Sequence, residues 1–147
     1  MDIIISRMTE GDLDEVVVIE KKVFADPWPK LAFKYDMEND YAIPLSVKLQ
    51  GIIAGYASTY HVEDEMQIGN IAVSPDFQHQ GIGSKLMAHI IQEAIGLKLK
   101  HIYLEVRQSN EIAIKLYYKF GFVIWGCRRL YYRHPTEDAL IMVKEIN

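Results

Sequence analysis

The chain has 147 residues, half of them hydrophobic and 24% charged, so it can bury the core of one globular domain spanning residues 1–147 and lacks a disordered composition. Its 16 lysines and arginines against 20 aspartates and glutamates lack the basic excess usual in nucleic-acid-binding proteins. One cysteine, Cys127, excludes an internal disulfide and a multi-cysteine metal cage, and the sequence contains no membrane-length apolar run or secretory leader pattern. We therefore expect a cytoplasmic protein that uses no metal, nucleic acid or membrane.

The first third of the chain predicts a strand followed by two helices. Residues 3–7 form a short apolar run, and Thr9 with Asp12 has the spacing of an N-cap and its acidic partner. A helix of about four turns is expected next, and residues 26–29, with two prolines, end it. A second short helix is expected over residues 31–37. The stripe of the first helix consists of Leu13, Val16, Val17, Glu20, Val23 and Phe24.

The middle of the chain predicts three strands and a helix. Residues 45–49 and 52–61 are strand-like and are joined by Gln50-Gly51, a two-residue hairpin turn. A third strand is expected over residues 66–73. The apolar period then changes to about four residues, which predicts a helix that ends at Gly96. The apolar face of this helix consists of Ile82, Leu86, Ile90 and Ala94.

The last third predicts a strand, a helix and two further strands. Residues 101–106 form the strand, Ser109 or Asn110 caps the helix, and β runs at 122–132 and 139–146 finish the chain. Strands and helices in this order predict an α/β (α+β) domain, a mixed sheet covered by helices.

The loop between the strand ending at Val73 and the helix starting at Ile82 is the most informative segment. Gly81 and Gly83 allow close approach of the backbone to a ligand, and free N–H groups at a helix start suit a phosphate or diphosphate. The spacing fits neither a P-loop nor a Rossmann fingerprint. A glycine-bearing N-cap without a ligand is the structural alternative.

The pattern Gln78-x-x-Gly81-x-Gly83 resembles the coenzyme A diphosphate loop of the GNAT acyltransferases. Residues 104–122 and 128–142, with Pro27-Trp28, are similar to the RimI/Ard-type protein N-terminal acetyltransferases of that superfamily. The resemblance implies a mostly antiparallel sheet of about seven strands with about four helices, in which the fourth and fifth strands splay apart. It also implies acetyl coenzyme A as cofactor. The implied cofactor-binding residues are Ile71, Ala72, Val73, Gln78, His79, Gln80, Gly81, Ile82, Gly83, Ser84, Asn110 and Tyr117.

The reaction that the resemblance implies needs a base and an acid. An α-amine has a pKa near 8, so roughly a tenth of it is neutral at pH 7, and one carboxylate is a sufficient base. Glu105, near the end of an apolar strand, matches the general base of the family. An ion pair with Arg107, Arg128 or Arg129 is the alternative role of this side chain. Reserve candidates for the base are His61, Glu63 and Glu65.

Aromatic residues supply the other implied roles. Tyr117 lies on the apolar stripe of its helix, where a core role is the simple interpretation, but it matches the general acid of the family. Tyr131 and Tyr132, together with Pro27 and Trp28, are implied to hold the acceptor polypeptide. The arginines around Tyr131 leave an RNA contact as a minor alternative, and Cys127 is expected to be a buried bystander.

We therefore predict an Nα-acetyltransferase that acts on the N-terminal segments of proteins, either ribosomal proteins or a broader set, by direct attack in a ternary complex. The alternatives are acetylation of a small amine or a lysine side chain, and a non-catalytic coenzyme A-binding module. A monomer or weak homodimer is expected, with an auxiliary subunit left open.

Overall fold

The computed structural model describes residues 2–146, which form one seven-stranded sheet with four α-helices. The strand order is β1-β2-β3-β4-β5-β7-β6, and every neighbouring pair is antiparallel except β4 and β5. This confirms the predicted mixed, mostly antiparallel sheet of the GNAT type. The strands are β1 (Ile3–Arg7), β2 (Ala42–Leu49), β3 (Ile52–Val62), β4 (Glu65–Val73), β5 (His101–Arg107), β6 (Val123–Tyr132) and β7 (Glu137–Glu145). The helices are α1 (Leu13–Val23), α2 (Lys30–Met37), α3 (Ile82–Gly96) and α4 (Glu111–Lys119), with 3-10 turns η1 (Glu10–Asp12) and η2 (Pro75–Phe77).

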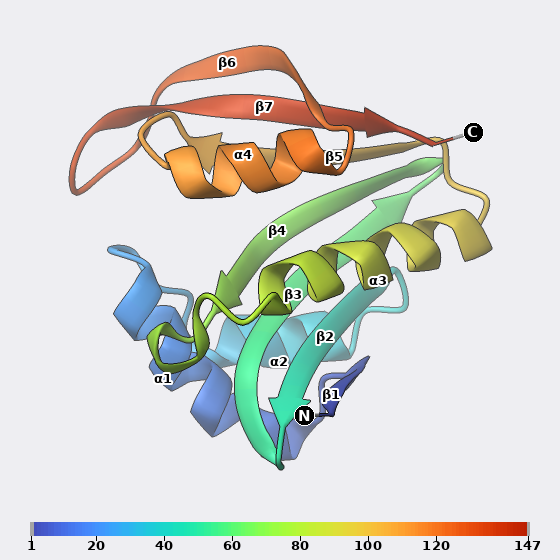
Figure 1. Ribbon diagram of the computed structural model, residues 1–147, viewed down its shortest axis with the longest axis vertical. Coiled ribbons are helices and arrows are strands. Elements are labelled where there is room, and N and C mark those ends of the chain that lie inside the picture. Colours follow the sequence, from blue (N-terminus) through green and yellow to red (C-terminus); the bar gives the residue numbers. More distant parts are fainter. Residues whose placement is uncertain (1, 147) are drawn as a thin grey trace.

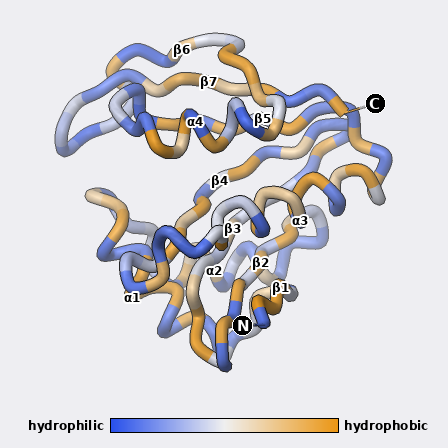
Figure 2. Tube along the Cα trace, viewed as in Figure 1, coloured by the Kyte–Doolittle hydropathy of each residue, from blue (hydrophilic) through white to orange (hydrophobic). Residues whose placement is uncertain are grey.

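The helices cover both faces of the sheet. Figure 1 shows α3 passing in front of β2 and β3, and α2 behind them. The larger apolar cluster joins α3 and α4 to the sheet, while a second cluster joins α1 and α2 to the opposite face through Phe33, Ile53 and Tyr56. The apolar periodicity that predicts these helices is visible as alternating colours along α4 (Figure 2).

The parallel pair β4 and β5 separates part-way along its length. Glu65 to Ile68 pair with His101 to Leu104, and no pairing continues beyond them in the described chain. The two strands diverge toward the left of Figure 1, where the loop between α1 and α2 and the turn between β6 and β7 lie on either side of the opening. Backbone groups of β4 after Ile68 therefore lose their β5 partners, as the predicted splay requires.

Local signals at the helix ends are mostly confirmed. Thr9 and Asp12 form the predicted capping box, in which Thr9 N–H donates to Asp12 Oδ2 (2.8 Å), although it caps the short turn η1 that leads into α1. Gly96 is the last residue of α3, but the left-handed residue is Lys98 (φ 59°). The helical turn continues past Gly96 because Leu97 N–H donates to Glu93 O.

Cys127 is exposed, so the prediction of a buried cysteine is wrong. It lies on β6, which is the last strand of the sheet because β7 inserts between β5 and β6. Most side chains of β6, Cys127 among them, are exposed. Among residues 2–146, no helix is both long and apolar enough to cross a membrane.

Candidate active site

A cavity of about 470 Å³ opens where β4 and β5 diverge. It is bordered by the end of α1 and the following loop, the second half of β4, the end of β5, and β6. The cavity therefore collects residues that are far apart in the sequence. Predicted site residues that line it are Trp28, Ile71, Glu105, Asn110, Tyr117, Tyr131 and Tyr132.

Glu105 reaches this cavity from β5. Ile102, Leu104 and Val106 are buried on one face of the strand, so the alternating Glu105 side chain points to the other face. Its Oε2 atom is buried and accepts no hydrogen bond from any residue between 2 and 146. Arg128 Nε lies 3.4 Å from this oxygen, so the ion pair expected as an alternative is present, with Arg128 as the partner. A carboxylate oxygen with no hydrogen-bond donor in a cavity can accept one from a ligand.

Tyr117 reaches the cavity from the other side, on α4. It is 5% exposed and its ring packs on Phe122 at 5.9 Å between centroids, so the core interpretation and the site interpretation both hold. Burial, and then the neighbouring Tyr132, raises the pKa of its phenol above the usual value. The hydroxyl therefore keeps its proton over the physiological pH range and acts as a donor.

Aromatic rings form the outer wall of the cavity. Tyr131 and Tyr132 meet edge to face at 5.1 Å, and Trp28 faces them from the loop after α1. Burial raises the pKa of Tyr132 to about 12, with a further contribution from Glu105. Pro27 lies in the same loop as Trp28 but is exposed and does not line the cavity.

The glycine loop lies outside this cavity, at the start of α3. Gly81 is the N-cap and adopts the left-handed conformation (φ 77°) that favours glycine. The first intrahelical bond is donated by Lys85 N–H to Gly81 O (3.1 Å), so the N–H groups of residues 82–84 precede the helical bonding pattern. Ile82 buries its side chain in the core, while residues 78–80 are exposed. The loop thus presents backbone donors and not side-chain charges.

Asn110 is the cap of α4. Its Oδ1 accepts a hydrogen bond from Ala113 N–H (3.2 Å), which decides between the two predicted caps, Ser109 and Asn110. Asn110 also lines the cavity. The same residue therefore starts the helix and faces the site.

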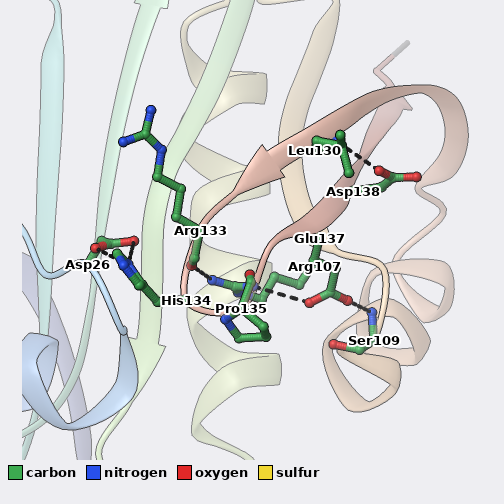
Figure 3. Close-up of polar contacts among 9 residues, drawn as sticks. All are labelled: Asp26, Arg107, Ser109, Leu130, Arg133, His134, Pro135, Glu137 and Asp138. Carbon is green, nitrogen blue, oxygen red and sulfur yellow. Dashed lines mark hydrogen bonds and ion pairs between the residues drawn. The ribbon is translucent and has the colours of Figure 1, made fainter.

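Arg107 and His134 hold the turn between β6 and β7 beside the cavity (Figure 3). Arg107 donates to the backbone carbonyls of Arg133 (2.7 Å) and Pro135 (2.9 Å), and its guanidinium lies over the Tyr132 ring. His134 Nδ1 lies 3.1 Å from Asp26 Oδ1, in the loop between α1 and α2. These contacts connect the two segments on either side of the opening.

Several residues lie elsewhere than the sequence suggests, and others were missed. The reserve bases His61, Glu63 and Glu65 lie at the turn between β3 and β4 and do not line the cavity. No group of three or more potential metal ligands occurs among residues 2–146. Lining residues that sequence reasoning did not select include Phe24, Asp26, Tyr60, Gln67, Asn70 and Arg107. Most of them lie close in sequence to Trp28, Ile71 or Glu105, whereas Tyr60, on β3, is near none of these in the sequence.

Comparison with known proteins gives the family. A sequence model of the acetyltransferase (GNAT) family matches residues 13–122, most of the chain. The chain belongs to the GNAT acetyltransferase family. It is similar to the [ribosomal protein bS18]-alanine N-acetyltransferase of Escherichia coli K12, with 38% identity over 147 residues and coverage of 97% of each chain. These matches confirm the predicted family and the predicted enzyme class, an N-acetyltransferase.

Solved structures of GNAT enzymes agree with this assignment. The crystal structure of the ribosomal-protein-S18-alanine N-acetyltransferase from Escherichia coli matches with a TM-score of 0.93 and 36% identity, covering 99% of this chain and 95% of that one. The PaiA N-acetyltransferase of Thermoplasma acidophilum, solved in complex with coenzyme A, shares the fold (TM-score 0.82, 15% identity, 99% and 100% covered). The GNAT fold thus accommodates coenzyme A.

Proposed function

We propose that this GNAT enzyme is an acetyl coenzyme A-dependent Nα-acetyltransferase that modifies the N-terminal amines of proteins, ribosomal proteins among them. The observation that carries the proposal is the carboxylate of Glu105, which lines the cavity and has one oxygen, Oε2, that accepts no hydrogen bond from residues 2–146. An α-amine is about one-tenth neutral at pH 7, so one carboxylate suffices as its base. The Escherichia coli relative, named for the alanine of ribosomal protein bS18, supports an N-terminal acceptor.

The residues present fit acetyl coenzyme A. The free N–H groups at the start of α3, after the left-handed Gly81, suit its diphosphate. Residues 78–84 would form this loop, and the β4 backbone at 71–73, unpaired with β5, would hold the pantetheine arm together with Asn110. When bound, acetyl coenzyme A supplies an acetyl group activated as a thioester.

Two side chains handle protons in this mechanism. The Glu105 carboxylate accepts a proton from the acceptor amine, which leaves the nitrogen lone pair free for direct attack in a ternary complex. Tyr117 Oη would donate a hydrogen bond to the thioester sulfur. Because the pKa of the phenol is raised above its usual value, whereas a thiol has a pKa near 8.5, Tyr117 would keep its proton until the leaving thiolate takes it. Tyr117 therefore acts first as a hydrogen-bond donor.

The aromatic wall would orient the acceptor polypeptide. Trp28 and Tyr131 both line the cavity, and Pro27 lies beside Trp28 in the loop but outside the cavity. The contact between Asp26 and His134 joins the flanking segments, so the acceptor enters by its end. A lysine within a chain would need both flanking segments of that chain to fit the same opening.

A peptide panel tests the proposal. The panel holds a hexapeptide with a free N-terminal alanine and one internal lysine, the same peptide with a blocked N-terminus, and spermidine as a small amine. We expect acetylation of the free α-amine only, located by fragment-ion mass spectrometry.

Each other outcome overturns the proposal in favour of a defined alternative. Labelling of the blocked peptide would make the protein a lysine acetyltransferase, and labelling of spermidine alone would make it a small-amine enzyme. The panel can be extended with peptides that begin with other residues. If calorimetry shows that acetyl coenzyme A binds but none of these peptides is labelled, the non-catalytic module would be favoured.

A further inference from the structure

Glu20 is a fully buried carboxylate inside an apolar cluster. It lies on the last turn of α1 and is 0% exposed, although the other buried residues of this helix are the apolar Leu13, Val16 and Ile19. No lysine, arginine or histidine pairs with it in the part of the chain that the structure describes. Burying an acidic group among apolar residues is costly unless donors satisfy it, so its partners should explain its presence.

Three donors from three different elements converge on this carboxylate. Trp28 N–H, in the loop between α1 and α2, donates to Oε2 (2.9 Å), and Asn70 Nδ2, on β4, donates to the same oxygen (2.8 Å). The Tyr56 hydroxyl, on β3, donates to Oε1. Burial, and then Glu20 itself, raises the pKa of the Tyr56 phenol, which therefore stays protonated and remains a donor. The carboxylate thus links α1, the loop, β3 and β4.

Two of these donors belong to residues that line the cavity. Trp28 and Asn70 both line it and share one carboxylate oxygen of Glu20 as acceptor. The Trp28 ring packs closely on β4 at Gly69. A Cβ atom added at Gly69 would lie only 3.2 Å from the indole. Pro27 and Pro29 carry no N–H, so Trp28 supplies the backbone donor between them. Removing the Glu20 acceptor would therefore free the loop where it borders the cavity.

We propose that Glu20 is a positioning residue that holds the Trp28 loop against β4 and so fixes the acceptor side of the active site. It touches neither acceptor nor cofactor and acts through Trp28 and Asn70. The cofactor side, at the start of α3, is independent of it. The inference rests on the proposed function, because it assigns the Trp28 side of the cavity to the acceptor polypeptide.

The test uses the Trp125→Phe protein, in which Trp28 is the only tryptophan. Trp125 is 67% exposed on β6 and lies outside the cavity, so this replacement leaves the site intact. Glu20→Met removes the acceptors and keeps a long side chain that suits the apolar cluster, while Glu20→Gln keeps one acceptor. Three quantities are compared: acrylamide quenching of Trp28, KM for the free alanine hexapeptide, and the Kd of coenzyme A.

We expect Glu20→Met to increase the quenching of Trp28 and to raise KM about tenfold, the factor that one hydrogen bond to a charged group typically provides. The Kd of coenzyme A should stay within about twofold, and Glu20→Gln should restore most of the wild-type behaviour. Unchanged quenching and KM with only a lower Tm would overturn the proposal and leave Glu20 a packing residue. An equal loss of coenzyme A affinity would overturn it as well.

Two features keep the test decisive. Tyr56→Phe removes the bond to Oε1 but leaves both bonds to Oε2, so it should lower Tm while leaving quenching and KM unchanged. If Glu20→Met does not fold, Asn70→Ala breaks the link between Glu20 Oε2 and β4 instead, and unchanged Trp28 quenching in that variant would refute the proposal. Quenching is measured without any substrate, so it reports on the loop even if the wild type does not acetylate the hexapeptide. A lack of acetylation would refute the proposed function but not the role of Glu20.

Discussion

At the scale of single residues, Glu105 is the side chain whose proposed role depends most directly on solution pH. Glu105→Gln should reduce kcat by about 10²- to 10⁴-fold at pH 7, the range that a general base provides. The deficit should shrink toward pH 9, because an α-amine with a pKa near 8 is then mostly neutral without help. Steady-state rates with the hexapeptide between pH 6.5 and 9.5 measure this. A deficit that stays constant over that range would mean that Glu105 has a structural role, such as its pair with Arg128.

Tyr117 provides the contrasting case at the same scale. Tyr117→Phe keeps the ring that packs on Phe122 but removes the donor to the leaving sulfur, so kcat should fall by about 10²-fold with little change in the Kd of coenzyme A. Because the raised pKa of Tyr117 keeps the wild-type phenol protonated across the tested range, this deficit should not shrink toward pH 9. Parallel loss of turnover and cofactor affinity would instead assign Tyr117 to packing alone.

At the scale of elements, the two glycines at the ends of α3 allow backbone strain and helix propensity to be tested separately. Gly81 and Gly96 both lack any heavy atom within 4 Å of an added Cβ, but only Gly81 has a positive φ (77°). Gly81→Ala should lower the free energy of unfolding by roughly 1–2 kcal/mol and weaken coenzyme A binding, because the N–H groups that follow it turn away. Gly96→Ala, the matched control, should be neutral or stabilising by up to about 1 kcal/mol with unchanged binding. Urea unfolding and calorimetry check both variants.

The elements themselves were largely predictable because their signals are local. The four-residue period of α3, the alternation along β5 and the hairpin signal at Gln50-Gly51 each depend on residues close in sequence. The splay of β4 from β5 was available only through the family resemblance. The position of β6 at the edge was not predictable from local pattern, so the exposure of Cys127 was missed.

At the scale of the whole molecule, the parts of the site that escaped prediction are contacts between distant segments. Glu20 stood on the predicted apolar stripe of α1, and a carboxylate there was a signal of a buried partner. That signal did not identify the donors, Tyr56 and Asn70, which lie 36 and 50 residues away in the sequence. The contact between Asp26 and His134 spans 108 residues and joins two loops whose approach only the assembled sheet decides. Such pairs depend on strand order, which one sequence expresses only weakly.

Stability against acid is a property of the whole molecule, and the buried Asp12 contributes to it. Its side chain is 6% exposed, pairs with Lys48 on β2 (3.1 Å) and accepts the hydrogen bond from Thr9 N–H. Burial works to raise the pKa of Asp12, but the bonds from Thr9 and Lys48 together outweigh it and the net pKa is lowered. A carboxyl group whose pKa is lower in the folded state stabilises the fold at every pH above its pKa in the unfolded chain, near 3.9. This contribution disappears as the pH falls through the pKa of the folded state.

Asp12→Asn should therefore lower the free energy of unfolding by roughly 1–2 kcal/mol at pH 7, and the difference from the wild type should narrow below about pH 4. Asp14→Asn is the control: Asp14 also has a lowered pKa, from its bond with Lys30, but its side chain is 87% exposed and solvent screens the pair. It should leave stability unchanged at both pH values. Urea unfolding at pH 7 and pH 3.5 measures the two variants. If Asp12→Asn lowers the free energy of unfolding equally at both pH values, the loss comes from packing and not from the charge of Asp12 that joins η1 to β2.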